Sequence, residues 1–181
     1  AENLLRAANN AIAIEEFRED GFSNALTRME LESKALKMAG WMKSKGVKKG
    51  DRVCCYMPNC SETVITMLAT SALGAIFSSC SSDFGVEGVI DRFEQIEPKI
   101  MIAANGYLYN GKVIDRSEEI NTISKRLPSL EHIIVVEYIS STVGINNLPN
   151  FNTVFQSDIL ENYVLCEFND CLLYTSDAAD D

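Results

Sequence analysis

The sequence predicts an α/β fold with a doubly wound parallel sheet that carries helices on both faces. Short apolar runs without polar alternation recur between residues 52 and 137, as expected of strands that are covered on both sides. Segments with helical periodicity or helix-cap residues separate these runs. Because strand and helix alternate, the connections must cross over the sheet, and the strands are expected to run parallel.

A hairpin is predicted at the start of the chain. Its strands are "AIAIEEF" and "FSNALT", and they are joined at Asp20 and Gly21, a dipeptide that tolerates positive φ. Thr27 and Glu30 then have the spacing of a capping box, and Gly46 supplies a stop for the helix that follows. The hairpin is therefore expected to lead directly into a long helix.

Strands and helices of the main sheet follow in alternation. The strands are expected near residues 52–57, 76–79, 100–104 and 132–137, and the helices near 28–45, 60–73, 86–96 and 116–126. Asn59 with Glu62 predicts a capped start for the second helix, and Ser82 predicts one for the third. Beyond Ser140 we expect a polar loop and one short helix-like piece, "SDILENY".

The last residues of the chain, "CLLYTSDAADD", are small and acidic and fit nothing before them. They resemble the translated adaptor sequence found at the ends of truncated reads, whereas a natural solvated tail is the alternative. Residues 1–169 are therefore expected to form a partial domain, and residues 170–181 a non-native tail that is left out of the fold prediction.

The composition of the 181-residue chain excludes several kinds of partner. Its formal net charge is −10, so nucleic acid and acidic membrane surfaces are not expected as partners, because clustered Lys and Arg bind these polyanions. The N-terminus lacks the basic start and apolar run of a signal peptide. The sequence also has no apolar stretch of about 18 residues that could span a membrane. A cytoplasmic protein is expected.

The titratable residues predict no catalytic set and no metal site. Six cysteines and one histidine show no metal-ligand spacing, and the cysteines are expected to be reduced and mostly buried. His132 starts an apolar strand and is expected to be a strand-edge residue. Asp83 and Glu87 lie one helical turn apart, where carboxylates near a helix N-terminus usually just complement the macrodipole.

Ligands of open parallel sheets bind outside the carboxyl ends of the strands, which directs attention to the loops after Met57, Cys80 and Ala104. Their sequences are "PNCSE", "SSDFG" and "NGYLYNGK". Neither the dinucleotide fingerprint nor a P-loop occurs in the chain. A self-sufficient nucleotide-binding module is therefore not expected.

The segment from "VKKGDRV" to "YLYNGK" closely resembles the acetoacetyl-CoA synthetases, within the superfamily of acyl-adenylate-forming enzymes. "GDRV", "PN" and a small-residue helix with "GAI" match the superfamily, while "DFG", "DRF", "QIEPK" and "YNGK" match the acetoacetyl group. The resemblance begins at "AENLLR" and extends to about residue 165. Ser82 departs from it, because the family commonly has proline there.

The resemblance implies an incomplete part of the large N-terminal domain of a cytosolic ligase. Acetoacetate and ATP, with magnesium, would give acetoacetyl-adenylate and pyrophosphate, and CoA would then displace AMP to form the thioester. In related enzymes the segments that match "SSDFG" and "YNGK" lie beside CoA. The cofactor-binding residues implied in this way are Ser82, Asp83, Phe84, Gly85, Tyr109, Asn110, Gly111 and Lys112.

Simpler interpretations stay open beside this one. "SSDFG" is equally consistent with a plain strand-to-helix turn, and Lys112 with a solvated loop lysine. An acetyl- or propionyl-CoA synthetase is the neighbouring alternative, and a non-catalytic α/β binding module is an alternative from another class. Because this sequence has no Ser/Thr- and Gly-rich loop that ends in Pro-Lys, the chain itself is expected to have no ligase activity.

Overall fold

A computed structural model describes residues 2–5, 9–140, 148–167, 170 and 172–174. Its centre is a five-stranded sheet in the order β8-β5-β3-β4-β9, and every pairing in this sheet is parallel. The strands are β3 (Arg52–Tyr56), β4 (Ile76–Cys80), β5 (Ile100–Ala104), β8 (His132–Val136) and the short β9 (Leu173–Tyr174). The predicted doubly wound parallel sheet is confirmed.

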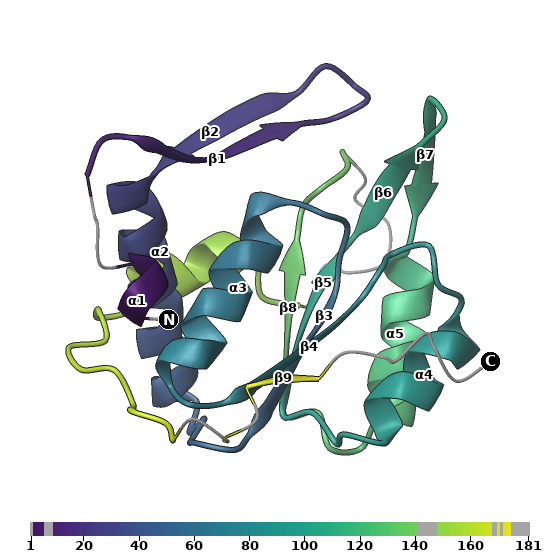
Figure 1. Ribbon diagram of the computed structural model, residues 1–181. Helices are drawn as coiled ribbons and strands as arrows, with labels where there is room; N and C mark the ends of the chain where they lie inside the picture. Colours follow the sequence, from purple (N-terminus) through teal and green to yellow (C-terminus); the bar gives the residue numbers. More distant parts are fainter. Residues whose placement is uncertain (1, 6–8, 141–147, 168–169, 171, 175–181) are drawn as a thin grey trace.

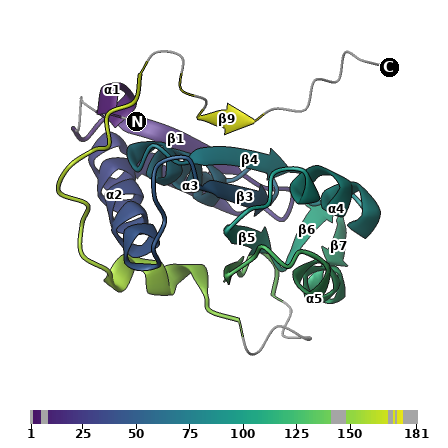
Figure 2. The same cartoon turned by 90° about the horizontal axis from the view of Figure 1, so that it is seen from below.

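Helices cover both faces of this sheet (Figures 1 and 2). One face packs against α2 (Arg28–Ser44) and α3 (Ser61–Ala72), and the other against α4 (Val86–Glu94) and α5 (Ser117–Arg126). A short helix, α1 (Glu2–Leu5), lies near α2. All four helices expected from the sequence around the main sheet are present, with ends within a few residues of the predicted bounds.

The residues of β3 show why the sheet needs both helix layers. Val53 and Cys55 belong to the apolar cluster that includes α2 and α3, whereas Cys54 and Tyr56 belong to the cluster that includes α4 and α5. Successive side chains of a strand point to opposite faces, so an apolar run without alternation must be covered twice. The two clusters together form the core of the domain.

The N-terminal hairpin is also confirmed. Its strands are β1 (Ile12–Phe17) and β2 (Ser23–Thr27), which pair antiparallel, and Gly21 has a φ of 85° in the turn. The capping box at the start of α2 is complete, because Thr27 Oγ1 accepts from Glu30 N at 3.2 Å and Glu30 Oε2 accepts from Thr27 N at 2.9 Å. Gly46, with a φ of 77°, follows the end of this helix.

The predicted caps of α3 and α4 are wrong. Helix α3 begins after Cys60, and helix α4 begins after Gly85, in both cases without a side-chain cap bond. The carboxylate of Glu16, which belongs to β1, accepts from Ser61 N at 3.0 Å and thus serves the start of α3. A residue 45 positions away therefore supplies the helix partner that local spacing had assigned to Asn59 and Glu62.

Two further differences lie in the connecting segments. The "NGYLYNGK" segment is not an open loop but a second hairpin, β6 (Gly106–Tyr109) and β7 (Lys112–Asp115), which pair antiparallel. The helix-like piece "SDILENY" is not helical. A 3₁₀ helix, η1 (Phe151–Gln156), precedes it instead and packs on α2. Of the polar loop predicted after Ser140, residues 141–147 lie outside the described part.

Glu16 provides a test of this tertiary cap. Replacing it with alanine should lower the free energy of unfolding by about 1–2 kcal/mol, because the Ser61 N–H and the helix terminus lose their partner. Glu15, the next residue of β1, is exposed, so Glu15→Ala is the matched control and should change stability little. Urea unfolding of the three proteins measures both effects. Equal losses in the two variants would contradict the capping role of Glu16.

Candidate functional site

The sheet order defines where a ligand can approach. The chain leaves β3 through α3 on one face and returns as β4, and it leaves the neighbouring β5 through α5 on the opposite face and returns as β8. Ligands of doubly wound sheets bind outside the carboxyl ends of strands at such a divergence. The loop 81–85 after β4 and the β6–β7 hairpin after β5 both leave this edge.

The loop after β4 is anchored by a side chain from β3. Tyr56 is completely buried, and its hydroxyl lies 3.1 Å from the carbonyl oxygen of Ser82 and 2.8 Å from that of Phe84. Burial raises the pKa of Tyr56 to about 12, so the hydroxyl keeps its proton and donates it to these carbonyls. The loop conformation is thus set from beneath by the central strand.

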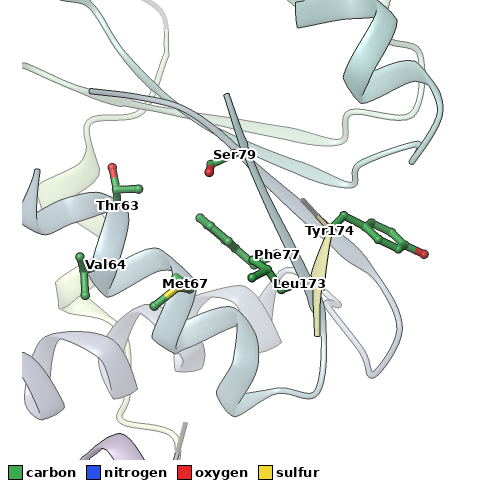
Figure 3. Close-up of a pocket in the computed structure, with 7 residues that line it drawn as sticks. All are labelled: Thr63, Val64, Met67, Phe77, Ser79, Leu173 and Tyr174. Carbon is green, nitrogen blue, oxygen red and sulfur yellow. The ribbon is translucent and has the colours of Figure 1, made fainter. Parts of the chain in front are cut away.

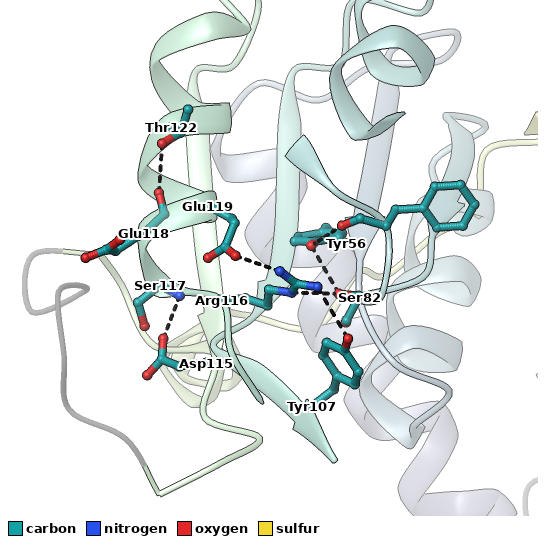
Figure 4. Close-up of polar contacts among 10 residues, drawn as sticks. Tyr56, Ser82, Tyr107, Asp115, Arg116, Ser117, Glu118, Glu119 and Thr122 are labelled. Carbon is teal, nitrogen blue, oxygen red and sulfur yellow. Dashed lines mark hydrogen bonds and ion pairs between the residues drawn. The ribbon is translucent and has the colours of Figure 1, made fainter. Parts of the chain in front are cut away.

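Arg116 connects this loop to the hairpin (Figure 4). Its Nε donates to the Ser82 carbonyl at 3.0 Å, and one terminal nitrogen donates to Tyr107 Oη on β6 at 3.3 Å. The other terminal nitrogen forms a 2.6 Å ion pair with Glu119. No motif in the sequence points to Arg116 or Tyr56, because both lie outside the two segments predicted to bind a ligand.

The site residues predicted on the loop have different environments. Ser82 is buried and does not cap α4, whereas Asp83 and Phe84 are exposed, and Gly85 is the N-cap residue of that helix. The Arg92 guanidinium, from α4, lies 4.6 Å from the centre of the Phe84 ring. The loop therefore presents an aromatic ring and a cation close together at the surface.

The residues predicted on the hairpin form its exposed tip. Asn110 and Gly111 have φ values of 50° and 73°, as in the two-residue turns with positive φ at both positions. Tyr109 and Lys112 flank this turn, and Gly111 N donates to Glu19 Oε2 of the N-terminal hairpin at 2.9 Å.

Arg92 is a functional candidate that the sequence analysis missed. Within the described part of the chain it has no ion-pair partner, and it lines a cavity of about 610 Å³ together with Arg52, Ser78, Ser79 and Gln95. Arg92 belongs to the "DRF" motif, which indicates a family resemblance but, by itself, no role in binding. Glu97 also lines this cavity and pairs with Arg52 at 3.8 Å, so Arg92 is the cation here that is left to meet an anionic group among the described residues.

A second cavity, of about 390 Å³, lies between α3, β4 and β9 (Figure 3). Its wall consists mainly of Val64, Met67, Phe77 and Leu173, and the hydroxyl residues Thr63, Ser79 and Tyr174 complete it, without a charged side chain. Leu173 and Tyr174 of this wall belong to the segment predicted to be a non-native tail. That prediction on the tail is neither confirmed nor contradicted.

The buried thiols and the two carboxylates near the start of α4 are held in ways that do not suit catalysis. Cys54, Cys55, Cys60 and Cys80 are free and buried, and burial raises the pKa of Cys60 to about 12 and that of Cys80 to about 11. Thiols in this state are poor nucleophiles. Asp83 and Glu87 form no carboxylate pair, because Glu87 is bound bidentately by Arg126 of α5.

The remaining predictions concern His132, metals and membranes. His132 is the first residue of β8, and its ring meets Trp41 edge-on at 6.2 Å, as expected of a strand-edge residue. Among the described residues, no three His, Cys, Asp or Glu side chains are arranged to hold a metal ion. The helices found in that part of the chain are all too short or too polar to cross a bilayer.

Comparison with known proteins defines the class. The family model described as "AMP-binding enzyme" matches residues 3–176, and the chain therefore belongs to the AMP-binding enzyme family. The fold agrees with a solved structure, the acetoacetyl-CoA synthetase from Streptomyces lividans, with a TM-score of 0.89 and 31% identity over 95% of this chain and 27% of that one.

Curated relatives indicate the particular group within this family. The acetoacetyl-CoA synthetase of Macaca fascicularis is 42% identical over 164 residues, which is 88% of this chain and 24% of the relative. That of Rhizobium meliloti is 41% identical over 145 residues, or 80% of this chain and 22% of the relative. The chain thus spans about a quarter of the length of these synthetases and corresponds to their N-terminal part.

Ser82 offers a test of the loop geometry. Its hydroxyl is buried without a hydrogen-bond partner, and it occupies the second position of a turn closed by Phe84 N and Ser81 O at 3.2 Å. Proline is favoured at this position. We expect Ser82→Pro to raise the free energy of unfolding by about 1 kcal/mol, through the lost hydroxyl and the restricted unfolded chain.

The control is Ser82→Ala, which removes the hydroxyl but leaves the backbone free, and it should give only part of the gain. Thermal and urea unfolding of both variants measure the difference. A Ser82→Pro protein that is less stable than wild type would show that the backbone at this turn does not fit proline.

Proposed function

We propose that this chain is the N-terminal part of an ATP-dependent acetoacetate–CoA ligase. The carboxylate of acetoacetate would attack the α-phosphate of ATP and release pyrophosphate, and the CoA thiol would then displace AMP from the acetoacetyl-adenylate. Membership of the AMP-binding enzyme family and the relatives named acetoacetyl-CoA synthetase support this function. The same relatives favour acetoacetate over acetate or propionate as the acyl group.

We assign to this part of the ligase the binding of the nucleotide end of CoA. One observation carries the assignment. The loop 81–85, here called the Phe84 loop, and the β6–β7 hairpin leave the same edge of the sheet and are joined by Arg116. Arg92 beside Phe84 and Lys112 at the hairpin tip supply cations for phosphate groups. The uncapped first turn of α4 adds main-chain N–H donors.

The donor set fits CoA but does not fit magnesium. Cations, N–H groups and an exposed aromatic ring suit a phosphorylated nucleotide, whereas the described residues offer no cluster of oxygen or nitrogen ligands for a metal ion. We place the binding of ATP and its magnesium in parts of the ligase that this sequence does not contain. The small residues after β4 would let the nucleotide approach the backbone, and this role would explain their presence there.

We also propose a cytosolic location for the ligase. Its four buried cysteines are free thiols, a state typical of proteins in a reducing compartment. Acetoacetate, ATP and CoA are the small-molecule partners under this proposal. We do not propose nucleic acid or an acidic membrane as a partner, because a chain with a net charge of −10 repels polyanions.

Lys112→Ala tests the CoA assignment in the full-length ligase that contains this region. Losing one charge-assisted contact of about 1.5–3 kcal/mol should raise the Michaelis constant for CoA by about ten- to a hundredfold. ATP–pyrophosphate exchange, which needs no CoA, should keep its rate. Lys125→Ala is the control, because Lys125 is an exposed lysine in the last turn of α5. A defect in exchange with normal CoA dependence would place Lys112 in the adenylation step instead.

The 181-residue chain by itself should release no pyrophosphate above a blank without protein. The physical reason is that it contains no loop to hold the β- and γ-phosphates of ATP. Incubation with ATP, magnesium, acetoacetate and CoA, followed by a pyrophosphate assay, checks this, and the full-length ligase is the positive control. Turnover by the short chain would mean that adenylation residues lie within it.

A further inference from the structure

Two side chains from outside the Phe84 loop determine the path of its main chain. Tyr56 lies beneath the loop on β3, and Arg116 lies beside it at the start of α5. Arg116 Nε donates to the carbonyl oxygen of Ser82 at 3.0 Å, and the single proton of the Tyr56 hydroxyl is shared between that oxygen, at 3.1 Å, and the Phe84 carbonyl oxygen, at 2.8 Å. Figure 4 shows the two donors converging on this one carbonyl.

The loop contributes little to its own shape. The Ser82 hydroxyl is buried and makes no hydrogen bond, and the bond from Phe84 N to Ser81 O at 3.2 Å closes a single turn. The Phe84 carbonyl oxygen accepts from Tyr56 at 2.8 Å, while the Phe84 ring lies at the surface against Arg92. The conformation therefore depends on the two external donors.

Arg116 is itself fixed in place. Glu119, one turn further along α5, pairs with one end of the guanidinium, and the Tyr107 ring lies 5.3 Å from its central carbon. Only 15% of the Arg116 side chain is exposed. Because guanidinium is planar, the pairing with Glu119 on one side sets the direction in which Nε points at the loop and the neighbouring terminal nitrogen points at the hairpin.

We propose that Tyr56 and Arg116 are positioning residues that hold the Phe84 loop and the β6–β7 hairpin in one arrangement. This arrangement sets the affinity for the nucleotide part of CoA. This inference rests on the function proposed above. A loop that is already ordered in its ligand-bound conformation binds more tightly, because less entropy is lost on binding. The two residues would affect CoA binding through the loop, without contacting CoA themselves.

Both donors keep their protons over the working range of the enzyme. The pKa of Tyr56 is raised to about 12 by burial. Burial alone would lower the pKa of Arg116, but its bond to Glu119 and further contacts raise the pKa above the ordinary value. The positioning contacts are therefore expected to be the same across neutral pH, and the variants should differ from wild type by a constant factor.

The test uses Tyr56→Phe and Arg116→Met in the full-length ligase. Tyr56→Phe removes one hydroxyl with no change of shape, and it should raise the Michaelis constant for CoA about three- to tenfold, the factor that corresponds to one hydrogen bond. Arg116→Met removes contacts to both segments and should have a larger effect. Arg116→Lys should fail to restore the wild-type Michaelis constant for CoA, because one ammonium group cannot reach the loop, the hairpin and Glu119 in the geometry of the planar guanidinium.

The matched control is Arg126→Met, which removes another arginine of α5 that pairs with Glu87 and makes no contact with the loop. Each protein is assayed for ATP–pyrophosphate exchange and for AMP release at varied CoA. The inference expects exchange near the wild-type rate in all variants and a raised CoA constant in the Tyr56 and Arg116 variants alone.

The possible outcomes separate the inference from the proposed function. A wild-type ligase without CoA-dependent AMP release would overturn the proposed function itself. A working wild type whose CoA constant is unchanged by Tyr56→Phe would overturn the positioning role, and so would exchange falling in parallel with CoA use. If Arg116→Met does not fold, Tyr56→Phe still decides the matter, because it removes only one oxygen atom.

Discussion

Strand β3 pairs with β4 along one edge and with β5 along the other, and helices cover both of its faces. This double constraint determines the rest of the architecture. Val53 and Cys55 must pack against one helix layer while Cys54 and Tyr56 pack against the other, so neither layer can be omitted without exposing apolar surface. The same strand ends in Tyr56, whose hydroxyl therefore reaches the loop after β4 from a rigid position.

The polar groups at this edge of the sheet are organised by long-range contacts. Arg116 from the start of α5 joins the Phe84 loop to the β6–β7 hairpin, and Glu19 of the first hairpin accepts from the tip of the second. Arg18 adds a contact to the Tyr138 carbonyl at 2.6 Å, just beyond β8. The two hairpins are thus attached to the sheet by side chains, which gives an exposed edge a defined shape.

The charge distribution is consistent with an anionic ligand at a local site. The chain as a whole is acidic, yet Arg92 has no ion-pair partner within the described residues and stacks on Phe84, while most other arginines are paired. The proposed binding of a nucleotide would use this guanidinium for a phosphate group and the exposed ring for stacking. The acidic remainder would limit the binding of larger polyanions.

The sequence by itself determined the main elements, because their causes are local. Uninterrupted apolar runs gave the four central strands, and periodicity with the Thr27–Glu30 capping box gave the helices around them. The resemblance pointed to the correct family. The hairpin at Asn110 and Gly111 is also encoded locally, since Asn-Gly is a strong signal for a two-residue hairpin turn. The sequence analysis, however, predicts a loop there.

Only the tertiary structure decided how the termini of the helices and the candidate site are built. Glu16 replaces a local cap on α3, and Tyr56 and Arg116 bind a carbonyl that lies 26 and 34 positions away from them. Arg92 meets Phe84 because the Phe84 ring lies back along α4, over Gly88. No spacing in the sequence encodes the contacts of Glu16, Tyr56 and Arg116, because each joins segments that only the tertiary fold brings together.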